Sequence, residues 1–216
     1  MRLVCVSDTH NHAAKAVLPD GDVLVHAGDF TLDGTRQEFE NFAAWLANVP
    51  HKYVVVIPGN HDFLAEDAPE LANEIISSAR QVIHYLLDQQ VVLDDIVFYG
   101  SPWTPWFGGY AFNLKRGPHL SAVWNRIPAN TNVLITHGPP AMIGDMVHHE
   151  GRLSIENVGD SDLSGAISKL THLKAHIYGH IHEGYGLRRV GGVSYANASL
   201  LDEHYILRNK PIVIDI

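Results

Sequence analysis

Five short runs of apolar, mostly β-branched residues recur along the chain, and each run ends in a cluster of polar residues. The runs cover residues 3–6, 23–26, 53–57, 133–135 and 175–178. Nearly continuous apolar runs of this length are typical of strands that are buried on both faces. In an open α/β sheet, ligands bind beyond the carboxyl ends of such strands. The five polar clusters are therefore predicted to gather at one edge of the fold.

Amphipathic helical patterns separate these runs. They cover residues 35–49, 69–80, 118–127 and 162–170, and the alternation of strands and helices predicts an α/β protein. Two further segments are rich in strand patterns and have no clear helix: residues 91–100 and 185–216. They predict a second, more antiparallel sheet, so that two sheets lie between layers of helices. Because no repeat or linker composition interrupts the pattern, we expect a single domain over residues 1–216.

Charge and composition narrow the classes of function. The 216 residues include 15 Lys and Arg against 24 Asp and Glu, a formal net charge of −9. This charge disfavours binding to long nucleic acid or to an anionic membrane. The only cysteine, Cys5, cannot form an internal disulfide. No apolar run is long enough to span a bilayer, and no signal-peptide pattern precedes residue 3, so we expect a soluble, cytoplasmic protein.

The polar clusters are rich in side chains that bind transition metals. They supply carboxylates, an amide and imidazoles: Asp8, His10, Asp29, Asn60, His61, His137, His180 and His182. The paired ligands of Asp8-x-His10 and His180-x-His182 are two residues apart, so an extended backbone directs each pair to one face. A mixed oxygen and nitrogen set suits Mn²⁺, Fe or Zn²⁺, whereas Ca²⁺ is bound by oxygen ligands alone.

The order of these clusters resembles that of a known family. The motifs Asp8-x-His10, Gly28-Asp29, Gly59-Asn60-His61-Asp62, His137-Gly138 and Gly179-His180-x-His182 resemble, in this order, the five blocks of the calcineurin-like metallophosphoesterases. Residues 28–31, 100–107 and 136–140 resemble its short branch of metallophosphoesterase-domain-containing proteins, which is similar to class III phosphodiesterases. The resemblance implies a four-layer α-β-β-α sandwich of two mixed sheets flanked by helices, in agreement with the strand and helix patterns.

Two other branches of the family are disfavoured. Protein Ser/Thr phosphatases carry an arginine shortly after the Gly-Asp pair, and residues 30–34 contain none. Purple acid phosphatases place a tyrosine ligand three residues after the aspartate, where this chain has Leu32.

The resemblance also implies a role for each site residue. The ligands of a first metal ion would be Asp8, His10 and His182. The ligands of a second would be Asn60, His137 and His180. Asp29 would bridge the two ions, His61 would act as general acid or transition-state donor, and Asp62 would orient the ring of His61. The cofactors are then two divalent ions, with Mn²⁺ favoured and Fe or Zn²⁺ as alternatives.

Two long connections, residues 101–113 and 141–160, carry candidates for substrate binding. The first contains four aromatic residues that could stack on a base or aryl group: Trp103, Trp106, Phe107 and Tyr110. An alternative interpretation is that this loop only caps the core. Weaker candidates for contact with substrate are Arg116, His148, His149 and Arg152, and a solvated salt bridge is the simpler role for the two arginines.

Two divalent ions about 3.5–4 Å apart can activate a shared hydroxide and clamp the oxygens of an in-line displacement at phosphorus. We therefore expect a metal-dependent phosphodiesterase whose partner is a small nucleotide-type phosphodiester, cyclic nucleotides included. The alternatives are a phosphomonoesterase acting on a small phosphate ester and a catalytically silent interaction module that binds metal. The sequence leaves the native metal, the physiological substrate and the oligomeric state open, and the aromatic loop could equally form a homodimer contact.

Overall fold

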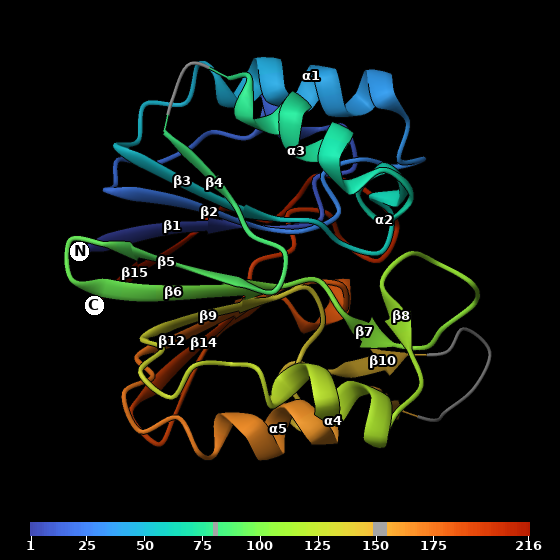
Figure 1. The fold of residues 1–216 in the computed structure, drawn as a ribbon, viewed down its shortest axis with the longest axis vertical. Coiled ribbons are helices and arrows are strands. Elements are labelled where there is room, and N and C mark those ends of the chain that lie inside the picture. The colour runs from blue at the N-terminus through green and yellow to red at the C-terminus, as the bar shows by residue number, and fades with distance from the viewer. Residues whose placement is uncertain (80–81, 149–154) are drawn as a thin grey trace.

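Two β-sheets stack face to face, and helices cover the outer face of each sheet. This arrangement is seen in a computed structural model that describes residues 1–79, 82–148 and 155–216 (Figure 1). The layers follow the order helix, sheet, sheet, helix, as the sequence predicted. The two ends of the chain lie side by side at one end of the molecule, where the amino group of Met1 donates to the carbonyl of Ile216 at 3.0 Å.

The first sheet holds the first four strands of the chain and its last strand. Its order is β15 (Ile212–Asp215), β1 (Arg2–Val6), β2 (Val23–Ala27), β3 (Tyr53–Ile57) and β4 (Ile83–Tyr85). Strands β1 to β4 are parallel, and β15 runs antiparallel to β1. The helices of its outer layer are α1 (Arg36–Leu46) and α3 (Pro69–Ser77), with the short α2 (Phe63–Asp67) beside them.

The second sheet is mixed. Its order is β13 (Gly186–Val190), β14 (Val193–Asn197), β12 (Ala175–Tyr178), β9 (Val133–Thr136), β6 (Ile96–Ser101) and β5 (Gln89–Leu93). Helices α4 (Pro118–Trp124) and α5 (Ser161–Ile167) cover its outer face. The sequence-based expectation for this sheet was partly wrong. The four central strands are parallel to one another, and only the two edge strands, β13 and β5, are antiparallel to their neighbours. The last strand of the chain, β15, belongs to the first sheet and not to this one.

Alternation along the inner strands explains why their apolar runs are continuous. In β1, Leu3 and Cys5 belong to the core between the two sheets, whereas Val4 and Val6 belong to the core under α1 and α3. Successive side chains of a strand point to opposite faces, so a strand covered on both sides needs apolar residues at every position. Burial on both faces also accounts for Cys5, whose thiol is fully buried.

Helix ends follow from local capping. At the start of α1, Thr35 and Glu38 form a capping box in which each side chain accepts from the backbone of the other. The helices α1, α4 and α5 end about one turn earlier than predicted. Beyond each end the chain continues with backbone bonds to the third residue back, as in Val49 to Leu46, and such tightened last turns satisfy carbonyls at a helix terminus.

The two long connections contain short strands of their own. Strands β7 (Thr104–Pro105) and β8 (Asn113–Leu114) pair within the first connection. Strands β10 (Met146–His148) and β11 (Ile155–Asn157) pair within the second. Two single 3₁₀ turns, η1 (Ala13–Lys15) and η2 (His182–Gly184), complete the elements of the described residues.

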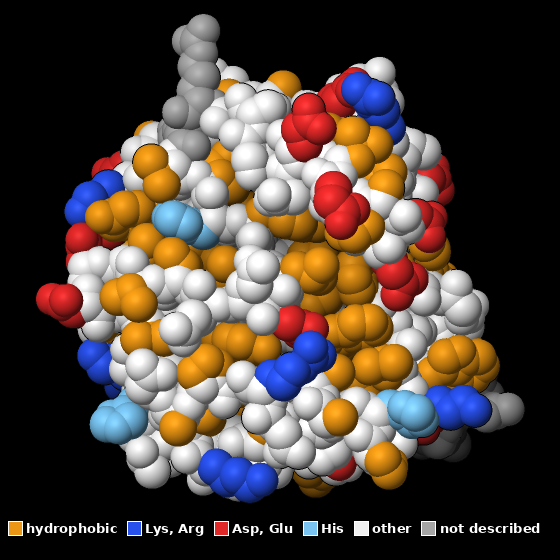
Figure 2. Space-filling model, in the orientation of Figure 1, with side chains coloured by type: hydrophobic (Ala, Val, Ile, Leu, Met, Phe, Trp, Pro, Cys, Tyr) orange, Lys and Arg blue, Asp and Glu red, His pale blue; other side chains and the backbone are white. Residues whose placement is uncertain are grey.

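The surface carries no large field of one sign on the face shown in Figure 2. Acidic side chains gather over α2 and α3 on that face, while Lys and Arg side chains lie apart from one another. Across the described residues, no helix combines the length and the apolar character that crossing a bilayer requires.

Candidate metal centre

The predicted ligands meet where the carboxyl ends of the strands of both sheets come together. Each ligand follows the end of a strand: Asp8 and His10 after β1, Asp29 after β2, Asn60 and His61 after β3, His137 after β9, and His180 and His182 after β12. An isolated parallel bridge between Ser7 and Ser199 joins the two sheets at this edge. Stacking of the two sheets therefore brings together residues that are far apart in sequence.

Backbone geometry at this edge is unusual for residues with side chains. Four of the predicted ligands have a positive φ: 50° at Asp8, 36° at His10, 55° at Asp29 and 68° at His180. Strained backbone of this kind clusters at functional sites. Glycine is required where a carboxylate comes closest to the chain, because a Cβ at Gly179 would lie 1.9 Å from Oδ2 of Asp8.

The ligands form two groups that a third group links. The first contains Asp8, His10 and His182, the second contains Asp29, His137 and His180, and the third joins Asp29 to His10 and His61. Within each group the candidate ligand atoms lie within 4.8 Å of one another. Oδ2 of Asp29 lies 3.2 Å from Nε2 of His137 in the second group and 3.8 Å from Nε2 of His10 in the first. Asp29 thus occupies the position that a bridging ligand needs.

Asn60 completes the second group. Its amide oxygen lies 2.8 Å from Nε2 of His137, so both atoms face the same point. The amide is buried with 3% of its surface exposed, and the carbonyl of Asn60 accepts from the backbone of Ala111. The sequence-predicted ligands of the second ion therefore lie together around Asp29.

Three of the imidazoles are held by their Nδ1 atoms. Nδ1 of His10, His137 and His182 lies 3.0, 2.9 and 2.8 Å from the carbonyls of Thr31, Ala27 and Asp202. A carbonyl can only accept a hydrogen bond, so Nδ1 of each ring carries a proton. Nε2, the other ring nitrogen, then faces the site. This arrangement is usual for metal-ligating histidines. Nε2 of His10 is buried without a hydrogen-bond partner, which fits a ligand atom that binds a cation.

These contacts and the burial of the site shift the pKa values of the candidate ligands. Burial opposes charge on His137 and His182, but the carboxylates of Asp29 and Asp8 outweigh it and raise the pKa of each to about 9. Burial also opposes charge on Asp8, yet the hydrogen bond and charge of His182 hold its pKa well below its usual range. For His180, burial and the neighbouring His137 lower the pKa to about 4. Without a cation, His137 and His182 therefore form ion pairs with Asp29 and Asp8. A divalent cation that binds there would displace the proton on Nε2 of each imidazole.

His61 lies beside both groups and is less buried than the ligands. Its Nδ1 donates to the carbonyl of Leu32 at 2.8 Å, and its ring lies 4.8 Å from that of His10 in an edge-on contact. Its backbone N–H donates to Oδ1 of Asp29 at 2.8 Å. His61 lines the pocket and forms a third candidate group with His10 and Asp29.

The role expected for Asp62 was wrong. Its carboxylate does not orient the ring of His61, which is held by Leu32 instead. Oδ2 accepts from the backbone of Gly59 at 2.7 Å and of Asp29 at 3.0 Å, and Oδ1 accepts from the backbone of Thr31 at 2.9 Å and from its hydroxyl at 2.6 Å. Burial and the charge of Asp29 raise the pKa of Asp62 to about 7, against the effect of these donors. Asp62 ties together the chain segments that follow β2 and β3.

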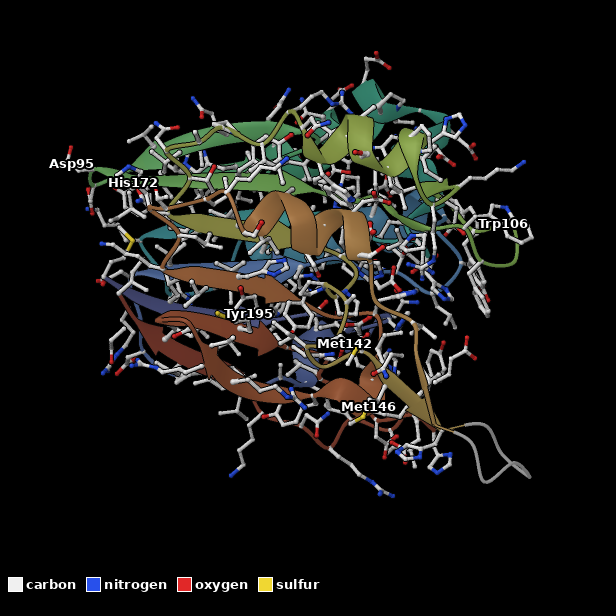
Figure 3. The ribbon with its side chains drawn as sticks, turned by 90° about the horizontal axis from the view of Figure 1, so that it is seen from below. Asp95, Trp106, Met142, Met146, His172 and Tyr195 are labelled. Atoms are coloured by element: carbon white, nitrogen blue, oxygen red, sulfur yellow. The ribbon has the colours of Figure 1, made fainter. Side chains whose placement is uncertain are left out.

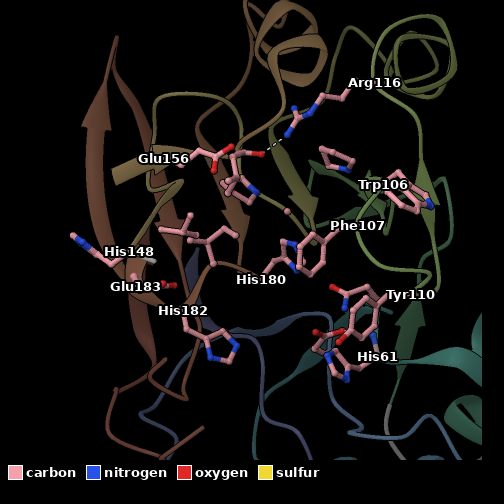
Figure 4. A pocket seen from close by; sticks show the side chains of 18 of the residues that line it. His61, Trp106, Phe107, Tyr110, Arg116, His148, Glu156, His180, His182 and Glu183 are labelled. Atoms are coloured by element: carbon pink, nitrogen blue, oxygen red, sulfur yellow. Dashed lines mark hydrogen bonds between the residues drawn. The ribbon is translucent and has the colours of Figure 1, made fainter. Parts of the chain in front are cut away.

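A pocket of about 530 Å³ opens over the two groups. Figure 4 shows Trp106, Phe107 and Tyr110 along one wall, with His61 below them, and His148, Glu156 and Glu183 on the opposite side. The rings of Phe107 and Tyr110 are parallel at 6.2 Å, and Tyr110 lies 4.9 Å from His61. The predicted aromatic wall therefore borders the metal centre.

Trp103 does not belong to that wall. It is partly buried against the cores under both helical layers, and its Nε1 donates to Asp88 at 2.9 Å. By contrast, Trp106 and Phe107 expose 63% and 67% of their surfaces. Figure 3 shows Trp106 at one end of the molecule, with Asp95 and His172 at the other end. The loop thus combines the two expected roles, since Trp103 caps the core and the later aromatic residues line the pocket.

Of the four weaker candidates for contact with substrate, two line the pocket and two lie outside the described residues. Arg116 lines the pocket, but its guanidinium donates to the carbonyls of Gly159 and Val158, so it links the segment before α4 to the second long connection (Figure 4). His148 lies at the rim of the pocket. His149 and Arg152 lie outside the described residues. The sequence did not point to Tyr205, which also lines the pocket, because it follows no motif and becomes a neighbour only through the fold.

Comparisons with known proteins agree with the fold and show the family. Residues 1–184 match the family model described as calcineurin-like phosphoesterase. The whole chain is 40% identical to the human protein named metallophosphoesterase domain-containing protein 1 and spans 71% of it. A 3',5'-cyclic adenosine monophosphate phosphodiesterase, CpdA of Escherichia coli, is 27% identical over 85% of this chain and 70% of its own. The crystal structure of TT1561 of Thermus thermophilus shares the fold with a TM-score of 0.58 at 12% identity, covering 91% of this chain and 88% of its own.

The two stacked sheets carry groups of His and Asp that could hold metal ions, and these groups follow the ends of central strands. The chain belongs to the calcineurin-like phosphoesterase family. Members of this family typically bind divalent metals, and the His and Asp groups described here fit such ions.

Proposed function

We propose that this protein is a binuclear metal-dependent phosphodiesterase that hydrolyses small nucleotide-type phosphodiesters, cyclic nucleotides included. The observation that carries the proposal is the position of Asp29 between two ligand groups on the floor of a pocket of about 530 Å³. Mn²⁺ is the favoured ion, because the ligand set of carboxylates, an amide oxygen and imidazoles suits it, with Fe or Zn²⁺ as alternatives.

In this proposal each ligand group holds one ion. The first group is Asp8, His10 and His182, the second is Asn60, His137 and His180, and Asp29 serves both. When bound, the ions supply Lewis acidity toward phosphoryl oxygens and lower the pKa of a water molecule toward neutrality. The two carboxylates offset only half of the four positive charges, so the pocket attracts a phosphate group although the protein is acidic overall.

His61 is proposed as the proton donor to the leaving oxygen. The bond from Nδ1 to Leu32 fixes the ring, so Nε2 alone can approach a substrate. Its ring borders both His10 and the aromatic wall, which supports a role beside the leaving group of a substrate bound at the metal ions. Donation by a positioned imidazole typically contributes a factor of about 10²–10⁴ to the rate.

The aromatic wall supports a nucleotide-like substrate. Phe107 and Tyr110 are stacked in parallel, and exposed aromatic rings of this kind offer about 1–3 kcal/mol to a stacked base. The related E. coli protein is named a cyclic AMP phosphodiesterase, which also supports a nucleotide-like substrate. On the face shown in Figure 2, the separated Lys and Arg side chains offer no continuous track for a long nucleic acid, which favours a small substrate.

Hydrolysis of two chromogenic esters tests the proposal. Metal-stripped protein is reloaded in turn with Mn²⁺, Fe²⁺ and Zn²⁺ and assayed on bis-p-nitrophenyl phosphate and p-nitrophenyl phosphate. We expect metal-dependent turnover that favours the diester, and its loss in Asp29→Ala but not in the exposed control Asp95→Asn. Preference for the monoester would favour a phosphomonoesterase. Absence of turnover with every metal would favour the interaction module.

A further inference from the structure

Tyr205 lies on the turn that leads from β14 toward β15, and it lines the pocket beside the first ligand group. Its ring centroid is 5.1 Å from that of His10 and 5.1 Å from that of His182. Although it contacts two buried ligands, 48% of its surface is exposed. The phenol ring therefore forms part of the pocket wall and is not a core side chain.

The turn is built around Asp202. Its carboxylate accepts from the backbone of His204 at 3.0 Å and of Ile206 at 2.9 Å. Its carbonyl accepts both from the backbone of Tyr205 at 2.9 Å and from Nδ1 of His182 at 2.8 Å. One carbonyl thus anchors a metal ligand and Tyr205 together.

The backbone of Tyr205 is in the left-handed region, with φ of 58°. A bulky aromatic residue rarely adopts this conformation, and residues held in it often serve a functional site. Here the bonds to Asp202 maintain it, and the result is that the ring lies against His10 and His182.

Among the described residues 1–79, 82–148 and 155–216, the hydroxyl of Tyr205 has no hydrogen-bond partner, and the residue lines the pocket. A phenol is a neutral donor at neutral pH. An unused donor beside the metal centre is available to a bound anion.

Four aromatic rings form a chain of neighbouring contacts beside the first ligand group. From one end to the other the successive rings are Tyr205, His10, His61 and Tyr110, with centroid separations of 5.1, 4.8 and 4.9 Å. Tyr205 and His61 both contact His10, and both line the pocket. A phosphoryl group bound at the first ligand group would therefore lie in the part of the pocket that these two side chains border.

We propose that Tyr205 is a substrate-contacting residue whose hydroxyl donates a hydrogen bond to a non-bridging phosphoryl oxygen held at the first ligand group. This inference rests on the proposed function and goes beyond it by assigning a specific donor. Because the oxygen is anionic, the bond belongs to the stronger, charge-assisted class. It acts on the phosphate that every ester substrate shares, whereas the wall of Phe107 and Tyr110 acts on the rest of the substrate.

Tyr205→Phe tests this role, since it removes the hydroxyl and keeps the ring against His10 and His182. The matched control is Tyr195→Phe, on β14, whose ring packs against His176 away from the pocket. Each Mn²⁺-loaded protein is measured for bound Mn²⁺, for thermal stability, for inorganic phosphate binding by calorimetry, and for kcat and KM on bis-p-nitrophenyl phosphate.

We expect Tyr205→Phe to weaken phosphate binding and to lower kcat/KM, each by about 10- to 100-fold, the loss typical of a hydrogen bond to a charged group. Mn²⁺ content and Tm should match those of the wild type, and Tyr195→Phe should match it throughout. Unchanged phosphate binding in Tyr205→Phe would overturn the inference. So would loss of Mn²⁺, because the hydroxyl would then serve the metal.

The phosphate measurement also separates this inference from the proposed function. A wild type that binds Mn²⁺ and phosphate but hydrolyses neither ester would contradict the phosphodiesterase proposal, while the comparison of phosphate affinities would still decide the role of Tyr205. An active wild type with an unaffected Tyr205→Phe would refute only the present inference.

Discussion

Oδ2 of Asp29 lies 3.2 Å from Nε2 of His137, and both side chains are buried where the two sheets meet. Without a cation, this contact pairs a carboxylate with an imidazolium. The same holds for Asp8 and His182, whose Oδ1 and Nε2 atoms are 3.5 Å apart. The stability of the metal-free protein should therefore depend on the charge of these two histidines.

Raising the pH should destabilise the metal-free protein. Burial opposes charge on His137 and His182, but their carboxylate partners raise the pKa of each from 6.5 to about 9. A pKa that is higher in the folded state gives a stabilisation that is complete below pH 6.5 and is lost as the pH rises through 9. Urea unfolding between pH 6 and 10 should show a falling free energy of unfolding. In His137→Gln the decline should be smaller, and an identical decline would contradict this assignment.

Replacing His61 should separate catalysis from metal binding. His61→Gln removes the donor at Nε2, so kcat on the diester should fall by about 100-fold or more, with the Mn²⁺ content unchanged. His172→Gln, at the far end of the molecule in Figure 3, is the matched control. Because His61 also lies within reach of His10 and Asp29 as a third candidate group, loss of bound Mn²⁺ would instead identify it as a ligand.

Asp62→Asn should destabilise the fold itself. An amide has only one accepting oxygen, whereas Asp62 accepts from donors at both of its oxygens. At least one buried N–H is left without an acceptor, which costs about 1–3 kcal/mol. Urea unfolding of metal-free protein measures the loss, and Asp95→Asn on an exposed hairpin serves as control. A stability equal to that of the wild type would show that the carboxylate is dispensable.

The two tryptophans of the aromatic loop should behave differently. Trp106→Ala should raise KM for a nucleotide diester more than for a small aryl phosphate and leave Tm unchanged, because its side chain is 63% exposed. Trp103→Ala should lower Tm, since it removes core packing and the bond to Asp88. Thermal denaturation and steady-state kinetics on both substrates check the pair. Equal effects of Trp106→Ala on the two KM values would refute stacking.

The sequence alone predicted the layered fold and the gathering of its polar clusters at one edge. The side chains of Asp8, His10 and His180 follow strands whose apolar runs are visible locally, and the carboxyl ends of neighbouring strands must meet at one edge. Short segments of the sequence were therefore enough to predict both the type of side chain and the edge of the fold at which it lies. Family membership rests on the family model that matches residues 1–184 and on the 40% identity with the human relative.

Only the tertiary structure decided which groups act on one another. The partner of Asp62 could not be predicted, because the donors that reach its carboxylate include backbone N–H groups of Asp29 and Thr31, about thirty residues away. For the same reason the sequence assigned Trp103 and Trp106 to one aromatic wall. In the structure Trp103 packs against the core, whereas Trp106 is exposed. Tyr205 joins the pocket only because a turn around Asp202 holds it against two histidines. Side-chain type and spacing are local properties of a chain, whereas the partner of each hydrogen bond is set by how distant segments pack.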